Sequence, residues 1–117
     1  MATSKDYLEY ILDVLSLCDN ITAKRLFGGY GLYQNGIIFA IIVENELYFK
    51  VDESNINLYQ NLNSEPLTFH AKRKAITMSY WKVPDEIIEN KELLVTHLEL
   101  AVLASAKTRN TKKQEKT

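Results

Sequence analysis

The chain turns at Arg25-Leu26-Phe27-Gly28-Gly29-Tyr30-Gly31-Leu32-Tyr33, a stretch that holds three of its four glycines. Glycine adopts positive φ angles at no steric cost, so this cluster predicts a sharp turn or a close backbone approach between two apolar, aromatic segments. Neither G-x-G-x-x-G nor G-x-x-x-x-G-K-[ST] can be laid over it, which excludes these two phosphate-binding motifs. The stretch therefore predicts a structural turn that joins two strands, and it indicates no catalytic activity.

The segments around this turn predict an antiparallel sheet. Residues 21–27 have the character of a short strand that enters the turn, and residues 31–33 continue the sheet. Asn35-Gly36 is a strong hairpin signal. The run Ile37–Val43 is continuously apolar and rich in β-branched residues, which is typical of a central strand covered on both faces, with a buried helix as the alternative. With a return strand over residues 47–52, we expect a three-stranded meander.

Two longer segments, near the two ends of the chain, have the spacing of amphipathic helices. Ser4 is a good N-cap for a helix over residues 5–17. Pro84, followed by two acidic residues, marks the start of one bent helix, or of two, reaching about Lys107. The positions that share one helix face are Leu8, Ile11, Leu12 and Leu15 in the first segment, and Leu94, Leu98, Ala101 and Ser105 in the second.

A short helix and a second hairpin are expected between these parts. Ser54 and Asn55 can cap a helix that ends near Leu62, with Ile56 and Tyr59 facing inward. Residues 67–71 and 75–81 alternate between apolar and polar side chains, and the polar tip Lys72-Arg73-Lys74 joins them. The order α-β-β-β-α-β-β-α predicts an α+β domain with a five-stranded antiparallel sheet and helices packed on it.

Charge divides the chain into a body and a tail. Residues 107–117 carry five basic side chains and one acidic side chain, a net charge of +4, and are poor in apolar residues. Residues 1–106 carry nine basic and fourteen acidic side chains, a net charge of −5. We therefore expect one folded domain over residues 1–106, whose overall field does not attract nucleic acid, and a disordered basic tail over 107–117.

Composition argues for an ordinary cytoplasmic domain. Hydrophobic residues make up 46% of the chain and charged residues 25%, as in other globular proteins. The N-terminus lacks the layout of a signal peptide, and no apolar run reaches the ~20 residues of a membrane helix. Cys18 is the only cysteine, so an intramolecular disulfide is excluded, and its position at the end of a helix favours a small buried hydrophobic side chain.

Catalytic and metal-binding patterns are absent from the sequence. His70 and His97 are the only histidines, and they lack the spacing of a helical metal site. Ser79 can be imagined beside His70 across the second hairpin, but it lacks the G-x-S-x-G elbow that exposes a nucleophile. We expect a protein that is not an enzyme and that uses no cofactor and no metal.

The strand aromatics offer a contact surface. Tyr48-Phe49 and Tyr80-Trp81 are adjacent pairs, so one member of each points to the core and its neighbour points away. Outward aromatics near Lys50 or Lys82 could stack on single-stranded nucleic acid or anchor a protein partner. The alternative is cross-strand packing beneath a helix.

Several blocks in fixed order resemble the TfoX N-terminal domain family, the N-terminal part of the Sxy/TfoX regulators of natural competence. The resemblance covers about residues 5–106. The matching pieces are 25–33, Gly36, 39–42, 47–52, Asn55 and 78–84.

This resemblance implies an α+β fold and a bacterial cytoplasmic regulator of transcription that acts without a cofactor. It also implies that the protein acts together with the cyclic-AMP receptor protein at the promoters of competence genes. Full-length members carry a second, helical C-terminal domain, and we expect this chain to be a stand-alone N-terminal module. The family supplies no catalytic residues to transfer.

The hypothesis that follows is a non-enzymatic module that binds protein. A homodimer, covering an edge or face of the sheet, is compatible with it. The candidate contacts for a protein partner are Arg25, Gly28, Gly29, Tyr30, Lys72, Arg73 and Lys74.

The alternative hypothesis is direct binding of nucleic acid through the 72–74 tip and the basic tail. Such binding rests on neutralised phosphates and falls steeply with salt. The candidate tail residues are Lys107, Arg109, Lys112 and Lys113. A small hydrolase or transferase is the least favoured reading, because it would need a pocket that holds a titratable group beside a nucleophile or a metal.

Overall fold

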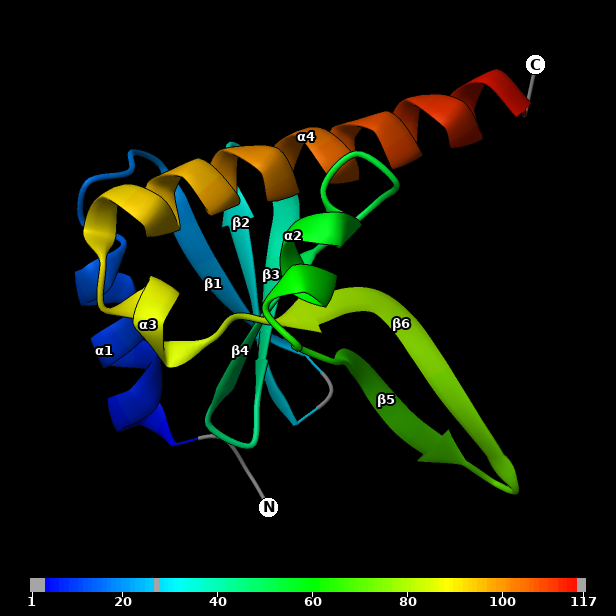
Figure 1. Ribbon diagram of the computed structural model, residues 1–117, viewed down its shortest axis with the longest axis horizontal. Helices are drawn as coiled ribbons and strands as arrows, with labels where there is room; N and C mark the ends of the chain where they lie inside the picture. The colour runs from blue at the N-terminus through cyan, green and yellow to red at the C-terminus, as the bar shows by residue number, and fades with distance from the viewer. Residues whose placement is uncertain (1–3, 27, 116–117) are drawn as a thin grey trace.

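The computed structural model describes residues 4–26 and 28–115 and forms one antiparallel sheet with helices against it (Figure 1). The strands lie in the order β1-β2-β3-β4-β6-β5, and each neighbouring pair is antiparallel. The elements are α1 (Lys5–Val14), β1 (Ile21–Leu26), β2 (Gly29–Gln34), β3 (Ile37–Val43), β4 (Glu46–Lys50), α2 (Ile56–Asn61), β5 (Pro66–Ala71), β6 (Lys74–Lys82), α3 (Asp85–Ile88) and α4 (Lys91–Glu115).

The α+β class and the antiparallel sheet are confirmed, but the expected number of five strands is wrong. The sheet has six strands, because the glycine-rich stretch contains most of a strand of its own. Gly28 adopts a φ of +77° between β1 and β2, whereas Gly29 and Gly31 lie within β2. The meander therefore has four strands. Phe27 lies outside the described residues.

Gly31 allows the close approach that the sequence suggested. A Cβ added there would come within 3.0 Å of Leu26 Cδ2 and 3.3 Å of Ile38 Cδ1. Side chains from both neighbouring strands thus cover this glycine, and a larger residue would displace them.

The following two hairpins turn through left-handed backbone. Asn35 and Gly36 have φ angles of 52° and 82°, so the predicted Asn-Gly hairpin is confirmed. Glu44 and Asn45, between β3 and β4, have φ angles of 51° and 58°. Asn45 Oδ1 also accepts hydrogen bonds from the Ser4 backbone N–H (2.9 Å) and hydroxyl (3.2 Å), which tie the start of α1 to this turn.

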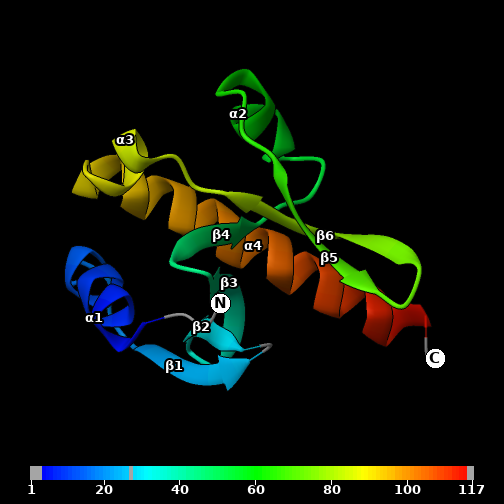
Figure 2. The ribbon, with the colours of Figure 1, turned by 90° about the horizontal axis from the view of Figure 1, so that it is seen from below.

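All four helices contribute to a core on one face of the sheet, here called the inner face. Ile11 and Leu15 from the α1 region, Tyr59 from α2, and Leu94 from α4 are buried there. Figure 2 shows α1 and α4 beside the curved β1–β4 part of the sheet. Helix α2 lies on the far side of β4 and β6 from β1 (Figure 2). The apolar run in β3 is buried on both sides, as expected, since Ile41 and Ile42 are both buried.

The helix limits differ from those expected at two places, the end of α1 and the end of α4. Helix α1 ends at Val14 rather than near residue 17, whereas the C-terminal region forms two helices, α3 and α4, which is one of the two expected arrangements. The Asn90 carboxamide accepts a hydrogen bond from the Leu93 N–H and so starts α4. The helical backbone of α4 runs to Glu115, past the expected end near Lys107. The helix continues from the segment that packs on the core into the polar residues that follow. The disorder proposed for residues 107–117 stays a prediction.

Caps at two helix starts were predicted, and one of them acts differently. Ser4 Oγ accepts the Tyr7 N–H at 3.1 Å, which confirms the cap of α1. The buried Asn55 side chain instead turns away from α2: its Oδ1 accepts from Asp52 N (2.8 Å) and its Nδ2 donates to Lys50 O (3.1 Å). Asn55 therefore holds the exit of β4 in place.

Replacement of this amide should destabilise the domain. Asn55→Ala leaves the partly buried Asp52 N–H and Lys50 carbonyl without the partner amide, so we expect the free energy of unfolding to fall by about 2 kcal/mol. Urea denaturation followed by circular dichroism measures it. Asn57→Ala, at an exposed position of the same helix, is the matched control and should change little. Equal losses in the two variants would contradict this role.

Candidate functional site

The candidate contact residues of the glycine stretch lie on the β1–β2 hairpin. Arg25 on β1 pairs with Tyr30 on β2, and the Arg25 guanidinium lies 5.8 Å from the centre of the Tyr30 ring. Arg25 is exposed and Gly29 is buried. Because β1 is an edge strand, one line of its backbone groups is open to a partner, as are its exposed side chains Thr22, Lys24 and Arg25.

The basic tip lies at the opposite edge of the sheet. Ala71 pairs with Lys74, so Lys72 and Arg73 form the turn of the β5–β6 hairpin, and all three basic side chains are exposed. Lys72 has a φ of 58°. Figure 1 shows this hairpin projecting from the body, with its tip well away from the helices. The structure therefore does not bring the tip and Arg25 into one site.

Of the four tail candidates, only Lys107 lies among the described side chains. It is exposed, and its positive charge acts on the carboxyl group of Asp52, which follows β4 in the sequence. Burial alone would raise the pKa of Asp52, but hydrogen bonds from Ser54 and the charge of Lys107 hold it below its usual range. The side chains of Arg109, Lys112 and Lys113 lie outside the described residues.

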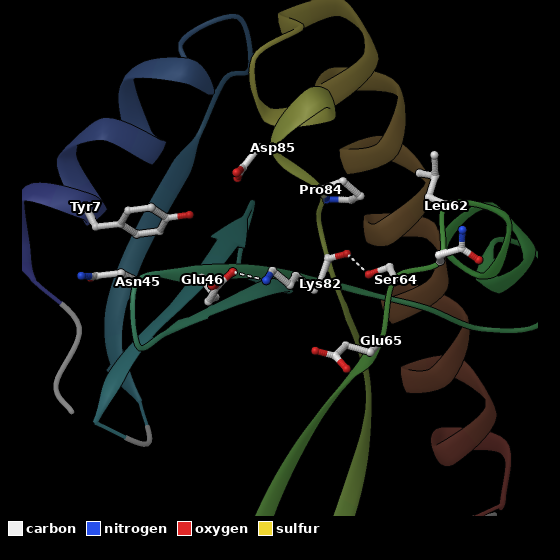
Figure 3. A pocket seen from close by; sticks show the side chains of 10 residues that line it. Tyr7, Asn45, Glu46, Leu62, Ser64, Glu65, Lys82, Pro84 and Asp85 are labelled. Carbon is white, nitrogen blue, oxygen red and sulfur yellow. Dashed lines mark hydrogen bonds and ion pairs between the residues drawn. The ribbon is translucent and has the colours of Figure 1, made fainter.

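A polar pocket that the sequence did not reveal lies between α1, the β3–β4 turn, the α2–β5 connection and the start of α3 (Figure 3). Lys82 crosses its floor, and its Nζ pairs with Glu46 Oε2 at 3.0 Å. Ser64 Oγ donates to the Lys82 carbonyl at 2.5 Å. Four separate segments of the chain supply the lining, which is why no local motif signals it.

The electrostatics of this pocket favour a positively charged or hydrogen-bonding group. Glu46, Glu65 and Asp85 line it together with a single cation, Lys82. The hydrogen bond that Lys82 donates to Glu46 raises the pKa of Lys82 above its usual value. Burial, with smaller contributions from Glu46 and Asp85, raises the pKa of Tyr7 to about 12, so its phenol stays protonated at neutral pH.

The pocket has no arrangement for nucleophilic or metal chemistry. Its lysine is protonated and paired, and its hydroxyl Ser64 bonds to a backbone carbonyl. Within residues 4–26 and 28–115, no group of three or more His, Cys, Asp or Glu side chains could hold a metal ion. In the same residues, no helix combines the length and apolarity needed to cross a membrane.

The two histidines have different surroundings. His70 is exposed on β5 and pairs with Ala75, so it lies away from Ser79, whose Oγ accepts from Lys50 Nζ at 2.6 Å. His97 on α4 is buried and faces Tyr59 on α2, with ring centres 5.6 Å apart. His97 Nδ1 and the Tyr59 hydroxyl are buried, and within the described structure neither has a hydrogen-bond partner.

Burial sets the protonation of this pair. It lowers the pKa of His97 below 6.5 and raises that of Tyr59 above its usual value, so both groups are neutral at pH 7. A neutral imidazole beside a phenol could exchange a proton with a substrate. Tyr59, however, is fully buried, so the pair is structural.

The lowered pKa of His97 predicts a loss of stability in mild acid. The unfolded state binds a proton near pH 6.5 and the folded state only at lower pH, so the stabilisation is complete above pH 6.5 and falls as the pH drops. Thermal melts between pH 7.5 and 5.5 should show a falling midpoint. His97→Phe should flatten this fall, whereas His70→Phe, at an exposed position, should leave it unchanged. An equally steep fall in His97→Phe would contradict the assignment.

The strand aromatics divide as expected. Phe49 and Trp81 form a cross-strand pair on the inner face, whereas Tyr48 and Tyr80 point to the other face. Cys18 packs against the core as a small hydrophobic side chain, but it is partly buried and not fully withdrawn from water. Burial nevertheless raises the pKa of its thiol.

The fold defines a small α+β domain whose antiparallel sheet carries its helices on one face. Comparison with models of known families matches residues 13–105 to the TfoX N-terminal domain. The chain belongs to this family, which confirms the resemblance seen in its sequence. It is also 26% identical over 107 residues to Protein Sxy of Escherichia coli (strain K12), an alignment that covers 89% of this chain and 51% of that protein. The chain thus spans about half the length of this curated relative.

Proposed function

We propose that this domain is a regulatory module that acts by binding a protein partner and not by catalysis. The observation that carries the proposal is the family match, which runs from α1 through every strand into α4 and so includes the whole sheet. The likeness to Protein Sxy supports a role in competence regulation. The partner implied by this role is the transcription machinery, and in particular the cyclic-AMP receptor protein.

The 72–74 tip is the surface that we assign to this contact. Its three basic side chains are exposed at the end of a projecting hairpin, where a partner can reach them from several directions. The residues that follow, 75–77, are also exposed, so the end of the hairpin does not pack against the core. This tip suits an acidic surface of a partner, and Arg25 with Tyr30 offers a second contact at the other edge.

A direct titration tests this assignment. The variant Lys72→Glu/Lys74→Glu should bind the purified cyclic-AMP receptor protein of the same organism at least about fivefold more weakly, because two exposed charge pairs contribute about 1 kcal/mol in total. Isothermal titration calorimetry at low salt measures the affinity. Arg25→Ala in the same titration shows whether the β1 edge takes part.

The matched control keeps the same change in net charge. Lys5→Glu/Lys91→Glu reverses two exposed lysines, at the start of α1 and at the start of α4, and should bind as the unmodified chain does. Figure 1 shows α1 and the start of α4 on the opposite side of the molecule from the tip. If both double variants bind equally weakly, the loss of affinity comes from the change in net charge, and the assigned role of the tip is wrong. If the unmodified chain does not bind the receptor protein, that choice of partner is wrong.

A further inference from the structure

The face of the sheet opposite the core, here called the outer face, carries two ordered rows of side chains. Strand pairing places Lys24, Gly31, Ile41, Tyr48 and Lys82 side by side across five strands. The neighbouring row contains Thr22, Tyr33 and Ile38 on β1 to β3, and Lys50 opposite Tyr80 on β4 and β6. Residues paired across strands point to the same face, so each row lies on one surface.

Tyrosine rings and lysine ammonium groups are combined on this face. Lys24 Nζ lies 5.4 Å from the centre of the Tyr33 ring, and Lys50 Nζ lies 5.3 Å from that of Tyr80. Tyr33 and Tyr48 are partly exposed, whereas Ile41 and Tyr80 are buried and form a floor between them. Gly31 has no side chain of its own, and the side chains of Leu26, Ile38 and Tyr33 cover its position.

Charge on the outer face runs against that of the folded body. Residues 1–106 carry a net charge of −5, yet the two rows contain three lysines and no carboxylate. One of these lysines, Lys82, is paired with Glu46 of the next row, and the charges of Glu46, Glu65 and Glu44 act on Tyr48. The positive charge of the face therefore lies at Lys24 beside Tyr33 and at Lys50 beside Tyr80, and this part of the face favours an anionic ligand.

We propose that the outer face binds single-stranded nucleic acid, with bases stacked on Tyr33 and Tyr48 and phosphates held by Lys24 and Lys50. Aromatic rings on an open sheet accept any base, because every base has a π-face, and lysines beside the rings meet the backbone. A duplex hides its base faces within the stack and cannot use these rings. This site is separate from the tip and the tail, and it does not depend on the protein partner proposed above.

A protein partner fits this face less well. It would have to bury the Lys24 and Lys50 ammonium groups against matched carboxylates, or leave them desolvated at a cost. A nucleic-acid strand supplies a phosphate with each base and leaves those phosphates partly in water. Two tyrosine rings of this face each have a lysine ammonium group beside them, Lys24 at Tyr33 and Lys50 at Tyr80, which favours such a repeating ligand.

Fluorescence anisotropy with a labelled oligothymidine of about twelve nucleotides tests the proposal. The full chain should bind it at low salt and bind the matched duplex with oligoadenosine at least tenfold more weakly. Neutralisation of two phosphates predicts about a 25-fold loss of affinity from about 20 to about 200 mM salt. Tyr48→Leu should weaken binding about tenfold by removing one stacking ring.

The controls separate stacking from general effects. Tyr10→Leu removes a tyrosine that is 44% exposed on α1, away from the outer face, and should leave the affinity unchanged. Lys24→Glu should weaken binding and flatten its salt dependence, whereas Lys91→Glu should have a smaller effect. Circular dichroism and thermal melts of each variant identify any loss of fold.

Three outcomes would overturn the proposal. They are no binding of oligothymidine by the full chain at low salt, equal binding of the duplex, and unchanged affinity in folded Tyr48→Leu and Lys24→Glu variants. If Lys72→Glu/Lys74→Glu abolishes binding while Tyr48→Leu does not, the nucleic-acid contact belongs to the tip and the outer face is not the site. None of these results affects the titration with the receptor protein.

Discussion

Burial of β3 on both of its faces is the constraint on which the rest of the structure depends. Ile42 and Phe39 must be covered on the inner face, and Ile41 must be covered on the outer face. Helices α1 and α4 meet the first requirement. The second is met by neighbouring side chains of the sheet itself, above all Tyr48, which pairs directly with Ile41, and Tyr80. An apolar central strand thus accounts both for the helical layer and for the tyrosines opposite it.

The two faces consequently have different roles. The inner face contributes stability, because its residues are withdrawn from water by four helices. The outer face is covered by tyrosine and lysine side chains, whose apolar rings and stems shield the strand. A surface of this kind protects the sheet and can still exchange its contacts with water for contacts with a ligand.

Buried and partly buried polar groups fix the connections between elements. Asn55 holds the chain as it leaves β4, Ser64 joins the α2–β5 connection to β6, and Asn45 joins the β3–β4 turn to the start of α1. These contacts leave the pocket of Figure 3 with defined walls, within which Lys82 and Glu46 face each other. The pair Tyr59–His97 is different, since its ring contact places two unpartnered polar atoms in the interior. That arrangement links stability to pH.

The sequence alone determined the local structure and the family. Helix starts at Ser4 and Pro84, the Asn35-Gly36 hairpin and the buried run of β3 follow from capping, turn chemistry and hydrophobic periodicity, which act over a few neighbouring residues. Only the tertiary structure decided that Gly29 and Gly31 belong to a strand, because strand pairing, not glycine content, defines β2. It also decided which side chains share a surface: the rows of the outer face, the pocket around Lys82 and the Tyr59–His97 contact each join segments distant in sequence. Such contacts depend on the order and register of the strands and on the packing of helices, which no local pattern encodes.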